Sequence, residues 1–219
     1  MVLSNATTPS FARATLAEQI AGDMAQMQQS VQPGAAERIA AYLQLLAKWN
    51  RAYNLTAVRA LQDMRVRHVL DSVAVRPWIN SEQRLLDVGS GPGLPGIILA
   101  LADDALDVTL IDANLKMTRF AEAAVRELAI KNVKIVRGRV EAYTGAQYEQ
   151  IISRAFASTT DFLALTEHLA APNGMWLAMK GRVDETVQSP FVCRATHALT
   201  IPGLDAQRHL QIYQKEAAL

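Results

Sequence analysis

The stretch Asp87-Val88-Gly89-Ser90-Gly91-Pro92-Gly93-Leu94-Pro95-Gly96 decides the fold class of this chain. It begins within a short, mostly apolar segment, 85–88, and leads into a longer apolar one, 97–102. Glycines let the backbone turn sharply and approach a ligand closely, and the start of a helix presents free N–H groups. We therefore predict a strand, a glycine loop and a helix that together bind a nucleotide-like cofactor.

Short apolar segments alternate with helical patterns downstream of this loop. Strands are expected at 85–88, 107–112, 133–136, 149–154 and 174–180, and helices at 94–102, 114–129 and 159–171. Asn114 and Thr159 stand where N-caps of the last two helices are expected. Such alternation predicts a parallel sheet covered on both faces. Two further strand-like segments, 194–201 and 208–214, should add an antiparallel pair at the sheet edge.

The N-terminal part of the chain has a helical texture. Residues 10–79 are rich in Ala, Leu, Gln and Arg and predict three helical stretches. The clearest carries Ile39, Leu43, Leu46, Trp49 and Tyr53 on one face. A further amphipathic stretch runs over 61–75, and about the first thirty residues are expected to be a frayed tail. We predict an α/β protein with a helical extension, 1–80, and a main domain, 81–219.

Composition excludes several classes of protein. The chain has 219 residues with 22 Lys or Arg and 21 Asp or Glu, and its net charge is +1. That balance argues against coating of nucleic acid by bulk charge, but it allows a local basic patch. The longest apolar run, 97–102, is far shorter than the roughly 20 residues of a membrane span. No secretory signal is recognisable, so we expect a cytoplasmic protein.

Metal and disulfide chemistry are not expected. Cys193 is the single cysteine, and the four histidines lack ligand spacing. Cys193 lies in the strand-like context Phe191-Val192-Cys193-Arg194, where we expect a buried, inert thiol.

The acid that precedes the glycines distinguishes two kinds of cofactor. Gly91, Gly93 and Gly96 satisfy the dinucleotide fingerprint, and Asp112 could accept hydrogen bonds from ribose hydroxyls in either case. A carboxylate at Asp87 would repel a pyrophosphate. S-adenosylmethionine has no phosphate and carries a sulfonium and an ammonium group. The pattern D-x-G-x-G-x-G resembles the first motif of class I S-adenosylmethionine-dependent methyltransferases, whose fold also has the C-terminal antiparallel strands. A nicotinamide-dependent oxidoreductase is the alternative.

Missing motifs narrow the methyl acceptor. Amine methyltransferases typically carry N/D-P-P-Y/F after the fourth strand, where this chain reads Ser153-Arg154-Ala155-Phe156. Pyrimidine C5 enzymes need a cysteine nucleophile, and the context of Cys193 does not favour that role. No general base is recognisable. Guanine N7 fits, because it has a free lone pair and needs only alignment with the sulfonium carbon.

Five motifs together resemble one family. They are Tyr53-Asn54-Leu55-Thr56, Arg65-Val66-Arg67-His68-Val69-Leu70-Asp71-Ser72, the stretch from Asp87 to Gly96, Ile152-Ser153-Arg154-Ala155-Phe156-Ala157 and Arg208-His209-Leu210. Over residues 35–214 the chain resembles the bacterial small-subunit ribosomal RNA methyltransferase G family, also called glucose-inhibited division protein B. The resemblance implies methyl transfer from S-adenosylmethionine to guanine N7 in the decoding-region loop of 16S rRNA. The expected substrate is the 30S subunit or its precursor, with no DNA or membrane partner, and we expect a monomer. A non-catalytic RNA-binding or ribosome-assembly protein is the second alternative.

Candidate site residues follow from the loop and from the resemblance. The loop pattern places Asp87, Gly91, Gly93 and Asp112 at the cofactor. The resemblance adds Gly89, Leu94, the adenosine-facing pair Val140 and Glu141, and Arg154, which is also a candidate for positioning the acceptor base. A basic rim for RNA phosphates is expected from Arg65, Arg67, His68, Arg137, Arg139, Lys180, Arg182 and Arg208.

Overall fold

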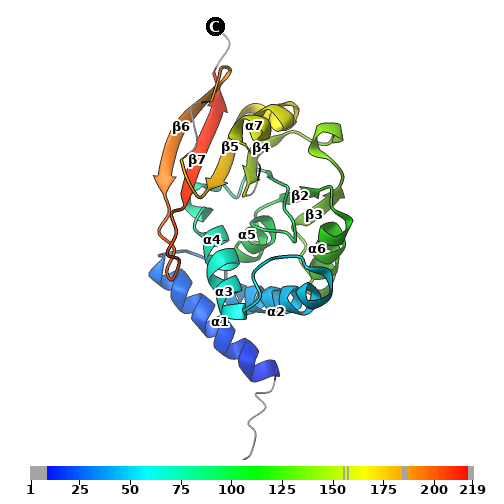
Figure 1. Ribbon diagram of the computed structural model, residues 1–219, viewed down its shortest axis with the longest axis vertical. Helices are drawn as coiled ribbons and strands as arrows, with labels where there is room; N and C mark the ends of the chain where they lie inside the picture. The colour runs from blue at the N-terminus through cyan, green and yellow to red at the C-terminus, as the bar shows by residue number, and fades with distance from the viewer. Residues whose placement is uncertain (1–8, 155, 157, 184–186, 217–219) are drawn as a thin grey trace, which may run out of the picture.

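The computed structural model describes residues 9–154, 156, 158–183 and 187–216, and its centre is a seven-stranded sheet (Figure 1). The strand order is β3-β2-β1-β4-β5-β7-β6. The strands are β1 (Leu85–Val88), β2 (Val108–Asp112), β3 (Val133–Arg137), β4 (Tyr148–Ser153), β5 (Ala170–Lys180), β6 (Phe191–Ala198) and β7 (His209–Lys215). The first five strands pair in parallel, and β7 runs antiparallel to both β5 and β6. The expected mostly parallel sheet with an antiparallel C-terminal addition is confirmed.

Helices cover both faces of the sheet, as predicted. The helices of this part are α5 (Gly96–Ala102), α6 (Leu115–Glu127) and α7 (Thr159–Thr166), with short 3₁₀ turns η3 (Val140–Ala142) and η4 (Glu167–Leu169). Successive strand residues point to opposite faces. Leu85 accordingly belongs to the core on the side of α5 and α6, whereas Leu86 belongs to the core on the side of α7.

Two sequence predictions around α7 are wrong in detail. The N-cap is Ser158, whose hydroxyl accepts a hydrogen bond from the backbone N–H of Asp161, rather than Thr159. The helix also ends at Thr166 instead of continuing to residue 171. Ala170 already pairs with Tyr148 of β4, so sheet pairing takes over the end of the predicted helix. At α6 the expected N-cap is confirmed, because Asn114 accepts from the N–H of Lys116.

The N-terminal helices pack directly on the α5 and α6 side of the sheet. They are α1 (Pro9–Gln26), α2 (Ala35–Tyr53), α3 (Leu61–Met64), the π-helical turn η1 (Arg65–Leu70), α4 (Asp71–Val73) and the 3₁₀ turn η2 (Arg76–Trp78). One cluster of buried apolar residues runs from Leu16 to Leu210 and includes residues on both sides of position 80. The domain division at residue 80 stays a prediction.

The expected frayed tail is wrong from residue 9 onward, where α1 begins. Leu16, Ile20 and Met24 recur at four-residue steps and are almost fully buried. This spacing gives α1 an apolar stripe that packs on the rest of the molecule, and Asp23 pairs with Arg65. Residues 1–8 lie outside the described part of the chain.

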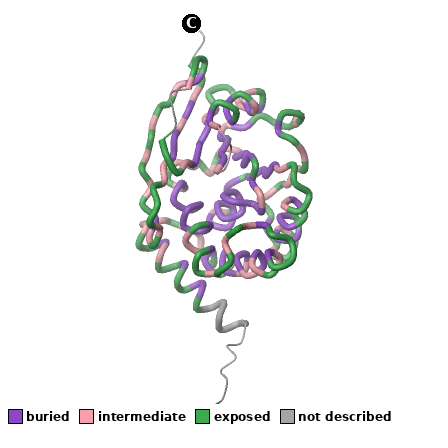
Figure 2. The backbone as a smooth tube through the Cα atoms, viewed as in Figure 1, coloured by how far each residue is buried: buried purple, intermediate pink, exposed green. Residues whose placement is uncertain are grey.

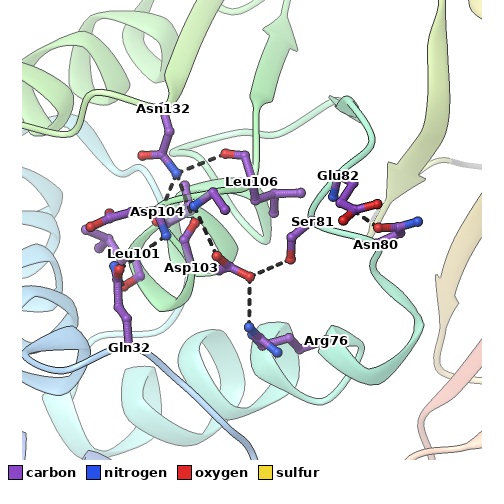
Figure 3. Close-up of polar contacts among 12 residues, drawn as sticks. Gln32, Arg76, Asn80, Ser81, Glu82, Leu101, Asp103, Asp104, Leu106 and Asn132 are labelled. Atoms are coloured by element: carbon purple, nitrogen blue, oxygen red, sulfur yellow. Dashed lines mark hydrogen bonds and ion pairs between the residues drawn. The ribbon is translucent and has the colours of Figure 1, made fainter.

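A polar network fixes the end of the sheet opposite the glycine loop (Figure 3). The carboxylate of Asp103, after α5, accepts hydrogen bonds from Arg76 and Ser81. The amide nitrogen of Asn132 contacts the carbonyls of Ala100, Asp103 and Leu106 at 2.9–3.1 Å. The network therefore ties the N-terminal helices to the turn between α5 and β2.

The prediction of a buried Cys193 is wrong, because its side chain is exposed at the edge of the sheet. It lies on β6, the outermost strand, which pairs only with β7. Figure 2 shows that this edge of the molecule is largely exposed. An edge strand leaves part of its surface uncovered, so its middle residues face solvent. Among the described helices, none combines the length and the hydropathy that a bilayer crossing requires.

Candidate active site

The carboxyl ends of β1, β2 and β3 meet at one edge of the sheet and enclose a first cavity of about 220 Å³. Such edges are where open α/β sheets bind ligands. Five of the predicted residues line this cavity: Gly89, Asp112, Arg139, Val140 and Glu141. The sequence analysis did not single out the other five lining residues, of which Phe156 contributes an aromatic wall. Phe156 could have been singled out from the sequence, because it lies in the motif 152–157 at the end of β4.

The backbone of the glycine loop makes room for a ligand. Gly89 has a φ of +66°, and a Cβ built on it would meet no atom within 4 Å. Gly93 has a φ of +100°, and a Cβ there would lie 2.4 Å from Ile97 Cδ1. Gly89 therefore keeps the cavity open, whereas Gly93 lets the loop pack against α5. Gly91 and Leu94 belong to the same loop but do not line the cavity, and Leu94 is buried in the core.

Asp87 lies at the base of the glycine loop. It is fully buried, and its Oδ2 accepts a hydrogen bond from the N–H of Gly96 at 2.7 Å. Burial raises the pKa of this carboxyl to about 7, although the hydrogen bond from Gly96 and the charge of Arg154 act in the opposite direction. Within this structure Asp87 fixes the start of α5, and its contact with the cofactor stays a prediction.

This pKa predicts a pH dependence of stability. An acid whose folded pKa of about 7 exceeds its ordinary value of 3.8 binds its proton more tightly in the folded state. Its contribution to the free energy of unfolding is therefore largest below about pH 4 and is lost by about pH 7. Asp87→Asn should not show this loss. The difference in the free energy of unfolding between Asp87→Asn and wild type should therefore shift in favour of the variant by up to about 4 kcal/mol between pH 4 and pH 8. Denaturant unfolding of both proteins across this range checks the prediction, and a pH-independent difference would contradict it.

Asp112 connects the glycine loop to α6. Its Oδ2 accepts from the N–H of Gly91 at 2.8 Å, and its Oδ1 accepts from the N–H of Asn114 at 2.7 Å. A carboxylate has about four lone-pair sites, so Asp112 can accept further hydrogen bonds from ribose hydroxyls at the cavity. Across the cavity lie the buried side chain of Val140 and the exposed Glu141. An apolar wall with nearby carboxylates fits the adenosine part of a cofactor.

A second cavity, of about 340 Å³, collects basic side chains from both parts of the chain. The N-terminal helices contribute Arg67, and the loop after β4 contributes Arg154. Lys180 ends β5, and Arg208 directly precedes β7. Arg154, which the resemblance assigns to the cofactor, thus lines this cavity rather than the first. Its Nη1 lies 3.2 Å from the carbonyl oxygen of Arg67 and donates a hydrogen bond to it.

Asp71 is the acidic residue of the second cavity, and the sequence analysis did not single it out. Its Oδ1 lies 3.2 Å from Arg208 Nε, and its Oδ2 lies 3.6 Å from Arg154 Nη1. Burial raises its pKa, while both arginines oppose that shift. The signal was its position four residues after Arg67, which brings the two onto one helical face. Asp71 therefore joins three separate segments around the cavity.

His68 also lines the second cavity, but it is buried. Its Nε2 lies 2.9 Å from Thr56 Oγ1, within hydrogen-bond distance. Burial and the charge of Arg154 lower its pKa to about 4, so the imidazole is neutral near pH 7. It therefore adds no positive charge to a cavity that already holds four cationic side chains.

The other predicted basic residues lie elsewhere. Arg65 pairs with Asp23 of α1 and hydrogen-bonds Gln62. Arg137 and Arg182 are exposed and line neither cavity. Within the described ranges no group of three or more His, Cys, Asp or Glu side chains is arranged to hold a metal ion. Of the predicted basic rim, the structure therefore brings four residues together at the second cavity: Arg67, His68, Lys180 and Arg208.

The sheet order, with a cavity at the carboxyl ends of β1, β2 and β3, is that of a class I S-adenosylmethionine-dependent methyltransferase. A solved S-adenosylmethionine-dependent methyltransferase from Aquifex aeolicus has the same fold, with a TM-score of 0.54 and 14% identity over 70% of this chain and 93% of that one. Residues 35–211 match the family described as "rRNA small subunit methyltransferase G". The chain belongs to this family, which confirms the resemblance of its motifs.

Two relatives show how closely the chain follows the family. "Ribosomal RNA small subunit methyltransferase G" of Neisseria meningitidis serogroup C is 43% identical over 90% of this chain and 98% of its own length. The protein of that name from Methylobacillus flagellatus is 49% identical over 80% and 86%. The nicotinamide-dependent alternative is therefore set aside.

Proposed function

We propose that this chain transfers the methyl group of S-adenosylmethionine to N7 of a guanine in the decoding-region loop of 16S rRNA. The observation that carries the proposal is the pair of cavities beside the segment that follows β4. Phe156 of this segment lines the cofactor cavity, and Arg154 lines the basic one. A cofactor and a nucleotide held in these two places would meet at that segment.

The residues of the basic cavity suit an acceptor that needs no deprotonation. When bound, S-adenosylmethionine supplies an electrophilic methyl group. Guanine N7 offers a lone pair without a proton, so the chain needs only to align the two partners. Asp71 is engaged by two arginines. The low pKa of His68, about 4, makes its imidazole a weak base, and its Nε2 is held by Thr56, so neither side chain is arranged as a general base. The carboxylate of Asp71 would offset the positive charge of a methylated guanine.

The cations of the second cavity supply contacts for the RNA backbone. Arg67, Lys180 and Arg208 would bind phosphates beside the acceptor, while Arg154 would position the base between the cavities. The 30S subunit or its precursor is the proposed substrate, with the protein acting as a cytoplasmic monomer and without a DNA partner.

Methyl transfer from radiolabelled S-adenosylmethionine tests this proposal. Unmodified 30S particles, naked 16S rRNA and DNA of similar length would be compared as substrates at equal nucleotide concentration. We expect label in the 30S particles and none in DNA. Label in naked RNA alone would overturn the 30S assignment. Tight cofactor binding without label in any RNA would favour the non-catalytic RNA-binding alternative.

A further inference from the structure

The C-terminal end of α2 carries an exposed aromatic side chain that the proposed chemistry does not use. Tyr53 is 47% exposed. Among the Phe, Trp and Tyr side chains that the structure describes, it is the only exposed one. It belongs to the motif Tyr53-Asn54-Leu55-Thr56, to which no role has been assigned.

Tyr53 is the outermost of four aromatic rings that contact one another in tilted and edge-on arrangements. Its ring lies 5.3 Å from that of Trp49, and Trp49 lies 5.7 Å from Phe120. Phe120 in turn lies 5.9 Å from Tyr42, whose hydroxyl donates a hydrogen bond to the carbonyl of Pro92 in the glycine loop. These ring contacts therefore position Tyr53 and connect it, through Tyr42, to the glycine loop.

A guanidinium group is held at the same end of α2, on the residues that flank Tyr53 in the sequence. Arg59 donates from Nη1 to the carbonyl of Asn50 at 3.1 Å and from Nη2 to Asn54 Oδ1 at 2.8 Å. Asn54 has a φ of +51° and ends α2, so the chain turns back at this point. Arg59 itself is exposed. The surface thus offers an aromatic ring and a held positive charge, which are the two groups that bind single-stranded RNA.

The same loop leads directly to the second cavity. Thr56 contacts His68 through its hydroxyl, and Val58 lines the cavity. Val58 follows Tyr53 by five residues, so their Cα atoms are at most about 18 Å apart. Figure 1 shows this loop leaving α2 and returning to α3. An RNA strand whose guanine occupies the cavity could therefore reach the ring with a neighbouring nucleotide.

We propose that Tyr53 and Arg59 form a stacking platform for an unpaired base next to the methylated guanine. The ring would stack on the face of that base, and the guanidinium would contact the adjoining phosphate. This inference rests on the rRNA methyl transfer proposed above. A ring that only covered Trp49 would contribute to stability and not to RNA affinity, which gives the two roles different readouts.

The test compares Tyr53→Ala, Tyr53→Leu and Tyr53→Phe with wild type. The Leu variant keeps apolar cover over Trp49 but lacks an aromatic face, and the Phe variant keeps the face. We expect the Ala and Leu variants to bind a 16S rRNA fragment about 10-fold more weakly, as for loss of one base stack, and Phe to match wild type. KM for RNA should rise accordingly, while affinity for S-adenosylhomocysteine stays unchanged. Arg59→Ala should also weaken RNA binding.

Arg38→Ala is the matched control for Arg59→Ala, because Arg38 lies near the start of α2 and pairs with Asp104. It should leave RNA affinity unchanged. If wild type methylates the RNA and both Tyr53→Ala and Tyr53→Leu bind it as wild type does, the platform is overturned and the proposed function stands. If wild type neither binds nor methylates RNA, the proposed function fails first.

Discussion

Gly89→Asp should abolish cofactor binding and leave the fold intact. The Cβ of residue 89 would point into open space, so the new side chain meets no neighbouring atom at its base. Gly89 lines the cofactor cavity of about 220 Å³, and a carboxylate placed there would occupy the room of the ligand. The φ of +66° adds backbone strain of about 1 kcal/mol, which a folded domain tolerates.

Calorimetric titration with S-adenosylhomocysteine checks this result. We expect affinity to fall by at least about 100-fold, which corresponds to about 2.8 kcal/mol of binding free energy. Gly34→Asp is the matched control, because Gly34 also has a positive φ, +78°, and open space around its Cβ, but precedes α2 far from the cavity in sequence. Affinity of Gly89→Asp within a few-fold of wild type would contradict the assignment of the cavity.

Asp71→Ala should have the second largest effect, on methyl transfer rather than on cofactor affinity. The carboxylate is shared by Arg154 and Arg208, and its loss would leave the cations of the second cavity without a counter-charge. Displacement of a positioning group by about 1 Å can cost roughly 100-fold in rate. We expect a decrease of about that size in kcat/KM for RNA. Binding of S-adenosylhomocysteine should be unchanged, because Asp71 does not line the first cavity.

Two further variants separate charge from shape and from stability. Asp71→Asn keeps an acceptor for Arg208 without the charge, so it should recover part of the lost rate if hydrogen bonding positions that arginine. Asp103→Ala removes a carboxylate paired with an arginine at the opposite end of the sheet. It should lower thermal stability without a specific loss in kcat/KM. Methyl transfer by Asp71→Ala within about three-fold of wild type, less than 1 kcal/mol, would contradict the positioning role.

The sheet could be predicted from the sequence because its signals are local. The segment 85–88 is a strand with the predicted bounds, and Gly89 to Pro95 form the expected loop before α5. The errors arise where tertiary contacts decide. The predicted helical end at Ala170 pairs with Tyr148 instead, and α1 is held by packing of Leu16 and Ile20 on distant elements.

The site could be predicted only in part, for a related reason. Gly89, Val140 and Glu141 line one cavity, and their contact with the cofactor stays a prediction. The pairing of Asp71 with Arg154 and Arg208 could not be predicted, since these residues lie 83 and 137 positions away along the chain. Likewise, Arg65 fell within a basic motif, but its partner Asp23 lies on a helix that the sequence analysis treated as a tail.

The identity of the methylated nucleoside tests the central claim most directly. Unmodified 30S particles would be incubated with the protein and S-adenosylmethionine, and their 16S rRNA would be digested to nucleosides and separated by chromatography with mass detection. The account predicts 7-methylguanosine, formed by wild type and lost with Gly89→Asp. A methyl group on any other nucleoside, or on another atom of guanosine, would contradict an acceptor site that works by alignment without a general base.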